Sequence, residues 1–204
     1  MGQVIGVDVG GTKIEAVLVD KHGTVQARSY GLTEAHKSRE DILLNLIAAV
    51  KAVWTEDVVG IGIGGPGGLK DDKVVFMPNI TPFLGLNLKH VLSREFSVPI
   101  FIENDANCFA LAEHRFGAAK GKRNVVGIII GTGVGGGLVI DNKLYTGSGW
   151  GGELGHIIID PSGIDCNCGN VGDFSSWCSG RNIVRHYLKA GGKIADPNPK
   201  KIFW

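Results

Sequence analysis

The chain has 204 residues, of which 44% are hydrophobic and 20% charged, and its formal net charge is +1. This balance is typical of a globular protein with a real core, of one ordinary domain or two small ones. The 21 basic and 20 acidic residues form no long runs, so neither nucleic acid nor a membrane is indicated as a partner. Without a leader pattern or a membrane-length apolar run, the sequence predicts a cytoplasmic protein that binds a small molecule.

Glycine is the unusual component, with 32 residues where about 7% of a chain is typical. The glycines gather at the ends of β-rich runs, in clusters at 10–11, 60–68, 131–137 and 147–155. Glycine in such places lets the backbone approach a ligand closely or adopt positive φ. The clusters therefore indicate ligand-facing turns rather than a linker.

The first predicted elements form a β-hairpin, with strands over 4–9 and 14–19. The turn between them is Gly10-Gly11-Thr12-Lys13. Its backbone amides suit a phosphate, the Thr12 hydroxyl and the Lys13 ammonium add donors, and Asp8 could hold Mg²⁺ directly or through water. A plain hairpin with solvated polar residues explains the same pattern, so the turn alone leaves both interpretations open.

Alternating strands and helices follow. They are predicted as a strand over 24–30, a helix over 39–54, a strand over 58–63, a helix over 87–96 and a strand over 99–102. The glycine loop after residue 63, which contains Gly65, reaches the same edge as the first turn. Asn79 offers an amide that both donates and accepts, as sugar hydroxyls require, although a lone loop asparagine is more often a turn residue.

Asn104 and Asp105 stand where the apolar strand stops and a helix over 106–116 begins. A free aspartate, with a pKa of about 3.9, is ionised at neutral pH and can accept a proton from a reacting hydroxyl. Both residue types are also favoured helix N-caps. The stretch therefore predicts either a catalytic base at Asp105 or a simple cap.

The second half repeats the strand–turn pattern. A strand over 125–130 restarts it, and we place the boundary near residue 117, between domains 1–117 and 118–204. The next turn, Gly131-Thr132-Gly133 and beyond, satisfies G-x-G-x-x-G, and Glu153 has a dinucleotide-type spacing. That motif must open a helix, whereas a second hairpin is predicted here, so we reject a Rossmann fold. A second phosphate-type turn remains, with Thr132 as a donor.

Glu153 and His156 lie in the last glycine cluster, before a strand predicted over 157–159. A carboxylate and an imidazole can bind adjacent hydroxyls, although a lone histidine is usually structural. Cys166 and Cys168 follow, and one histidine with two close thiols is typical of Zn²⁺ in a reducing compartment.

The fourth zinc ligand is not decided by the pattern. Asp173 is favoured by spacing and Cys178 by sulfur chemistry. A metal-free interpretation, with inert buried cysteines, also stays open.

Six motifs stand in the order found in the ROK family of sugar kinases, which the chain resembles over residues 4 to about 180, the glucokinase type above all. They are residues 8–13, 64–67, 103–107, 131–137, 153–156 and 166–169. The resemblance implies an α/β protein with the actin-like ATPase (ribonuclease H-like) fold, of two domains around a cleft. It also implies ATP-dependent phosphorylation of a hexose, glucose first, at the 6-hydroxyl, with Asp105 as the base.

The same resemblance implies roles for individual residues. ATP phosphates and Mg²⁺ would be held by Asp8, Gly10, Gly11, Thr12, Lys13, Gly131, Thr132 and Gly133. The sugar would contact Gly65, Asn79, Asn104, Glu153 and His156, and Zn²⁺ would bind His156, Cys166, Cys168 and Asp173. The dimer common in this family stays open for this chain.

Two departures from the family pattern matter. In Cys-x-Cys-Gly-x-x-Gly-Cys-x-Glu the third cysteine is Asp173 and the sugar-binding glutamate is Ser175. Zinc accepts a carboxylate, but the missing charged sugar contact should cost roughly 1.5–3 kcal/mol. Family members also continue past this chain's end with a segment that contacts adenosine. We therefore expect the C-terminal part to be missing and ATP to bind poorly, and a non-catalytic sugar sensor or an inactive fragment is the alternative.

Overall fold

A computed structural model describes residues 2–65, 67–70, 72–77, 79–166 and 168–193. The chain divides into two compact units, Met1–Cys108 and Phe109–Trp204. The units part within helix α3 (Asp105–Arg115), earlier than the boundary that we place near residue 117. Among the described residues, none of the helices combines the length and the apolar character that crossing a membrane would require.

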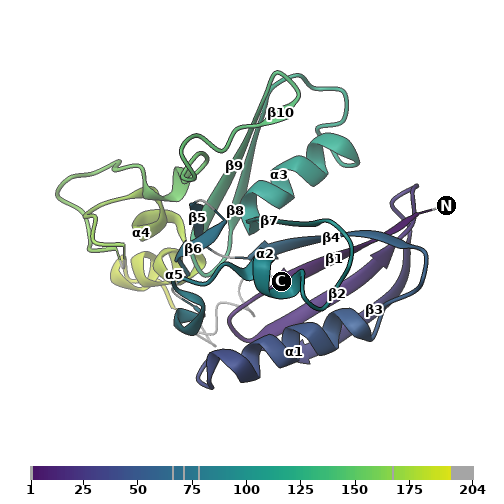
Figure 1. Cartoon of the computed structure of the whole chain (residues 1–204). Helices are drawn as coiled ribbons and strands as arrows, with labels where there is room; N and C mark the ends of the chain where they lie inside the picture. Colours follow the sequence, from purple (N-terminus) through teal and green to yellow (C-terminus); the bar gives the residue numbers. More distant parts are fainter. Residues whose placement is uncertain (1, 66, 71, 78, 167, 194–204) are drawn as a thin grey trace. The chain divides into compact units, whose positions relative to one another are not determined.

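The first unit contains a five-stranded sheet in the order β3-β2-β1-β4-β7. Its strands are β1 (Gln3–Val9), β2 (Lys13–Val19), β3 (Val25–Leu32), β4 (Val58–Gly65) and β7 (Ile100–Asn104). The first three strands are antiparallel neighbours, whereas β4 and β7 run parallel to β1 (Figure 1). The carboxyl ends of β1, β4 and β7 therefore meet at one edge, and loops at such an edge are where ligands bind in α/β sheets.

Helix α1 (Arg39–Lys51) covers one face of this sheet and packs on β2 and β3 (Figure 1). Ile42, Leu46 and Val50 recur every fourth residue and are buried, as the predicted amphipathic helix requires. Ser38 caps its start by accepting a hydrogen bond from the Asp41 amide.

The other elements of this unit are β5 (Gly68–Lys70), β6 (Lys73–Phe76), the 3₁₀ turn η1 (Thr81–Phe83) and α2 (Leu88–Leu92). The β5–β6 hairpin was not predicted. Helix α2 is shorter than the predicted 87–96, because the amides of Arg94 and Glu95 bond to carbonyls three residues back, in tighter turns.

The second unit contains a three-stranded sheet in the order β10-β9-β8. Its strands are β8 (Val125–Ile130), β9 (Val134–Ile140) and β10 (Lys143–Leu144). A strand, not a helix, follows the glycine turn, which confirms the rejection of a Rossmann fold. The strand order β10-β9-β8 repeats the order β3-β2-β1 of the first unit. Helix α3 packs so closely on this sheet that a Cβ on Gly127 would lie 2.8 Å from the Cβ of Ala110.

The predicted strand over 157–159 is wrong. The 3₁₀ turn η2 (Leu154–His156) precedes it, and Ile158 makes only an isolated bridge to Asp173. Isoleucines favour strands, but here the amides of Ile159 and Asp160 both bond to the Gly172 carbonyl, which leaves no ladder. Two unpredicted helices follow, α4 (Phe174–Cys178) and α5 (Gly180–Lys189). Asn167 of the cysteine motif and the chain end from 194 lie outside the described residues.

Strand β8 is the edge of its sheet in the part of the chain that the structure describes. Val126, Ile128 and Ile130 point to one face and are 61%, 45% and 54% exposed. In the first unit, the equivalent strand β1 pairs with β4 in parallel on its second edge. An exposed apolar edge strand is a template for self-association.

Ile128→Lys is therefore expected to reduce self-association of the 204-residue chain, because an edge lysine opposes strand pairing. Sedimentation velocity at increasing protein concentration measures this. The control is Val59→Lys, which changes a 55% exposed valine on β4, a strand paired on both sides. Equal self-association of wild type and Ile128→Lys would contradict the assignment of β8 as the strand through which the chain self-associates.

Candidate active site and metal centre

Three acidic residues gather at the carboxyl-terminal edge of the parallel strands in the first unit. Asp8 on β1 is in register with Gly64 on β4, and Gly64 is in register with Glu103 on β7. Asp105 follows two residues later, at the start of α3, and a Cβ on Gly64 would lie 3.8 Å from its Cα. Gly64, which has no side chain, therefore lets the start of α3 lie close to β4.

The pKa of the Cys108 thiol, on α3, reflects the negative charge of this cluster. Burial, followed by the charges of Glu103, Asp105 and Asp8, raises the pKa of the Cys108 thiol to about 11. Cys108 is therefore a protonated, partly buried thiol, as expected for a core residue. It supplies no nucleophile at neutral pH.

Asn104, and not Asp105, caps helix α3. Its Oδ1 accepts hydrogen bonds from the amides of Ala106 (2.9 Å) and Asn107 (3.2 Å), and its Nδ2 donates to the Gly67 carbonyl at 3.1 Å. Asp105 is exposed at the first helical position, and among the described residues its carboxylate accepts a hydrogen bond only from the Ala106 amide, at 2.8 Å. The two interpretations of this stretch therefore fall on different residues: the cap is Asn104, and the Asp105 carboxylate stands open to a ligand.

Asp8 is held in an unfavourable electrostatic environment. Loss of hydration to the surrounding chain, and then the charge of Asp105, raise the pKa of Asp8, and Lys13 only partly offsets them. A bound cation would stabilise a carboxylate whose ionised form is disfavoured in this way. The residues present fit Mg²⁺, which prefers oxygen ligands and often retains several waters.

Asp8→Asn is expected to raise the thermal unfolding midpoint at pH 7. Because the folded-state pKa of Asp8 is raised, its ionisation lowers the stability of the folded chain at pH 7. This penalty shrinks as pH falls through the raised pKa, and it vanishes below the unfolded value of about 3.9. The stabilisation should therefore shrink between pH 7 and pH 3 in scanning calorimetry. Asp57→Asn, at an exposed position before β4, is the control. A lower midpoint for Asp8→Asn at pH 7 would refute this account.

The first glycine turn is closed by its own backbone and braced from outside. The Gly10 amide donates to the Lys13 carbonyl at 2.9 Å. Thr33, fully buried beyond β3, donates its hydroxyl to the Gly10 carbonyl at 2.6 Å and its amide to the Thr12 carbonyl at 3.0 Å. Sequence reasoning missed Thr33, since nothing local marks it.

Lys13 and Asn79 complete the surroundings of this turn. The Lys13 ammonium is paired with Glu15 at 3.1 Å, with its side chain 56% exposed. Such an exposed pair is weak, so a phosphate can compete for the lysine. Asn79 lies against the turn, because a Cβ on Gly11 would come within 2.8 Å of the Asn79 Cβ. Asn79, a proposed sugar contact, is therefore a neighbour of the proposed phosphate turn.

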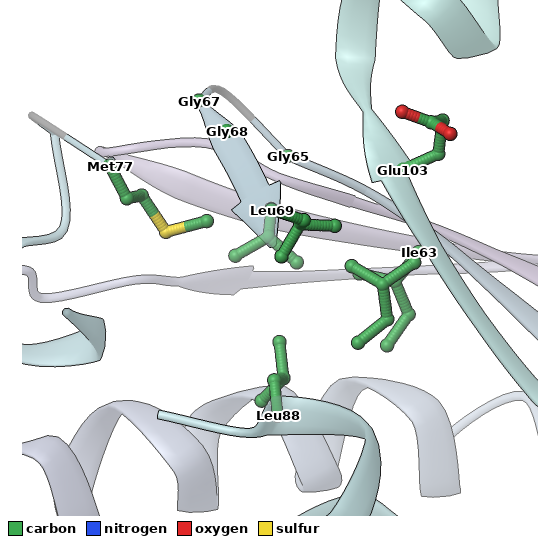
Figure 2. A pocket seen from close by; sticks show the side chains of 10 residues that line it. Ile63, Gly65, Gly67, Gly68, Leu69, Met77, Leu88 and Glu103 are labelled. Carbon is green, nitrogen blue, oxygen red and sulfur yellow. The ribbon is translucent and has the colours of Figure 1, made fainter. Parts of the chain in front are cut away.

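An apolar pocket lies beneath this edge (Figure 2). Gly65 and Met77 line it, together with Val9, Ile63, Gly67, Gly68, Leu69, Leu88, Ile102 and Glu103. Figure 2 shows the side chains of Ile63, Leu69 and Leu88 directed toward one another, with the Glu103 carboxylate apart from them. Sugar hydroxyls require polar partners, and the apolar side chains of this pocket offer none.

The second glycine turn is held by the helices that follow it. The Gly131 amide donates to Gly133 and its carbonyl accepts from the Gly180 amide, both at 2.8 Å, while the Val134 amide donates to the buried Ser175 Oγ at 3.1 Å. Gly131, Thr132 and Gly133 are exposed. Ser175 therefore holds the turn, a role that its sequence position did not reveal.

The four predicted metal ligands come together in the second unit. The donor atoms of His156, Cys166, Cys168 and Asp173 all lie within 4.8 Å of one another, and Cys178 is not in the group. Donors around tetrahedral zinc are about 3.3–3.8 Å apart, and here His156 Nδ1 lies 2.9 Å from Asp173 Oδ2 and 3.8 Å from Cys166 Sγ. The residues present therefore fit Zn²⁺ in number and chemistry, with four donor atoms gathered in one place.

Asp173 is ionised in this group. Burial opposes its ionisation, but hydrogen bonds from Cys166, His156, the Ser176 amide and Cys168 outweigh burial and lower its pKa to about 2. Burial and the hydrogen bond to Asp173 raise the pKa of the Cys166 thiol to about 12. A bound metal must displace that proton, as is general for thiolate ligands.

His156 links the metal group to Glu153. Its Nδ1 faces the metal donors, and its Nε2 lies 4.0 Å from Glu153 Oε2. A metal-bound histidine usually directs its other ring nitrogen to a carboxylate, which sets the tautomer. This geometry can serve a metal on one side of the ring and a hydroxyl-binding pair on the other.

Comparisons with known proteins agree with the fold and with the family resemblance. The sequence matches the ROK family over residues 4–203. It is 40% identical over 190 residues to a glucokinase of Streptomyces coelicolor, covering 91% of this chain and 59% of that protein. It is also 38% identical over 191 residues to the xylose repressor of Bacillus subtilis, covering 90% of this chain and 50% of that protein.

A solved structure, the ROK family glucokinase of Streptomyces griseus in complex with glucose and AMPPNP, superposes with a TM-score of 0.78 at 38% identity, covering 92% of this chain and 61% of that one. The fold is thus the α/β, actin-like ATPase fold of ROK sugar kinases, as predicted. The chain belongs to the ROK family. It spans between half and two thirds of the length of these relatives.

Proposed function

We propose that this chain carries the catalytic half-sites of an ATP-dependent hexose kinase, with glucose as the first substrate to test. The observation that carries the proposal is the exposed Asp105 carboxylate, which Asn104 frees from capping. Asp105 takes the proton of the sugar 6-hydroxyl while that oxygen bonds to the γ-phosphorus. The bond from this phosphorus to the β–γ bridging oxygen breaks, and ADP leaves.

The remaining residues supply positioning and charge. The turns at 10–13 and 131–133 offer backbone amides to phosphates, and Asp8 would hold Mg²⁺, which neutralises charge on the phosphates when bound. Gly65, Asn79, Asn104, Glu153 and His156 are the proposed sugar contacts; Asn104 has committed one of its amide hydrogens to Gly67. His156, Cys166, Cys168 and Asp173 would hold Zn²⁺ in a structural role.

A coupled assay with a panel of hexoses and N-acetylhexosamines tests the proposal. We expect ATP-dependent formation of a sugar phosphate, fastest with the natural hexose. A second candidate, a sugar sensor without catalysis, is favoured by the similarity to a xylose repressor. Titration calorimetry distinguishes them, since a sensor binds sugar without AMPPNP and a kinase binds both.

A further inference from the structure

The metal group and the second glycine turn are built on the same two segments of the second unit. His156 closes η2, and the preceding Gly155 lies so close to the turn that a Cβ on it would fall 1.9 Å from the Val134 carbonyl oxygen. Asp173 precedes α4, whose Ser175 Oγ accepts from the Val134 amide at 3.1 Å. Val134 is therefore hydrogen-bonded to one segment that carries a metal ligand and lies directly against another.

Asp173 joins the metal group to α4 through the two oxygens of one carboxylate. Its Oδ2 faces the metal donors, at 2.9 Å from His156 Nδ1 and 3.4 Å from Cys168 Sγ. Its Oδ1 accepts a hydrogen bond from the Ser176 amide at 2.7 Å, and the backbone carbonyl of Asp173 accepts one from the Ser176 hydroxyl at 2.8 Å. Whatever fixes Oδ2 therefore also fixes the N-cap of α4.

The segment that follows α4 returns to the same turn. At the start of α5, the Gly180 amide donates to the Gly131 carbonyl at 2.8 Å. The turn is thus bonded to α4 at Val134 and to the first residue of α5 at Gly131. Between these two points, the amides of Thr132 and Gly133 have no partner among the hydrogen bonds of the described chain, and they are the groups left for a phosphate.

We propose that Ser175 is a positioning residue that couples metal binding at the His156 group to the order of the phosphate turn at 131–134. The inference rests on the proposed zinc and phosphate roles and adds a regulatory link between them. A metal on Asp173 Oδ2 holds the cap, the cap holds α4, and Ser175 holds the Val134 amide. Metal occupancy then raises affinity for the nucleotide phosphates without touching them.

Amide hydrogen exchange of Val134 tests this link, measured by NMR on the ¹⁵N-valine-labelled chain with zinc and after its removal. We expect zinc to slow the exchange severalfold. Ser175→Ala should retain zinc but lose the zinc effect, with Val134 exchanging roughly two- to tenfold faster, the range for one hydrogen bond. Ser175→Thr should restore it, because the hydroxyl returns.

Ser93→Ala, which removes the hydroxyl bond to the Lys89 carbonyl in the first unit, is the control and should leave Val134 exchange unchanged. Zinc bound at one per chain with no change at Val134, or with the same change in Ser175→Ala, would overturn the coupling. Failure to bind zinc would overturn it together with the metal site. A chain that shows the coupling but has no kinase activity would refute only the proposed function.

Discussion

Asp105→Asn is expected to lower kcat for hexose phosphorylation by roughly 10²–10⁴, the usual contribution of a general base. Asparagine keeps the shape of the side chain and cannot accept the proton. The fold should not suffer, because Asn104 already caps α3, and removing the charge beside Asp8 relieves a repulsion. The thermal midpoint should therefore stay equal to that of the wild type or rise.

Asn104→Ala is the matched variant, and it should lower the stability of the folded chain. Loss of the cap typically costs about 0.5–2 kcal/mol, so its thermal midpoint should fall. Steady-state kinetics together with calorimetry separates the two residues. If Asp105→Asn were fully active, or if its activity fell only in step with its stability, Asp105 would be a structural residue.

Asp173→Asn is expected to abolish stoichiometric zinc binding while α4 stays capped. Asparagine still accepts from the Ser176 amide, but it lacks the charge that zinc ligation uses. Asp173→Ala loses both roles, and the lost cap alone should cost about 0.5–2 kcal/mol, or roughly 2–4 °C per kcal/mol in the midpoint. Elemental analysis of protein purified without chelator, and calorimetry of the metal-free forms, measure the two effects.

Cys178→Ser is the control for the zinc measurement, because Cys178 lies outside the group of four donors. It should retain one zinc per chain. Zinc lost from Cys178→Ser but retained by Asp173→Asn would reverse the assignment of the fourth ligand. Wild-type protein without zinc would remove the metal centre from this account.

Local pattern was enough to predict the two hairpins, helix α1 and three of the four members of the metal group. Each depends on residues close in sequence: Ile42, Leu46 and Val50 show a helical period, and Cys166 and Cys168 are two apart. The glycine turns could likewise be located from their composition. Which backbone groups a turn leaves for a ligand could not be predicted in the same way.

The contacts that hold the turns join distant parts of the chain. Thr33 braces Gly10 from 23 residues away, and Ser175 bonds to Val134 from 41 residues away. Ser175 appeared from its motif only as a lost sugar contact, whereas its hydroxyl holds the phosphate turn. The isoleucines at 157–159 mislead for the same reason, since a strand needs a partner that local propensity does not supply.

The most direct test of the kinase assignment is ³¹P NMR of the 204-residue chain with ATP, Mg²⁺ and glucose. The account predicts equimolar ADP and glucose 6-phosphate, with no sugar phosphate when 6-deoxyglucose replaces glucose or when Asp105 is asparagine. Unchanged ATP, or hydrolysis to free phosphate that is the same with and without sugar, would contradict it.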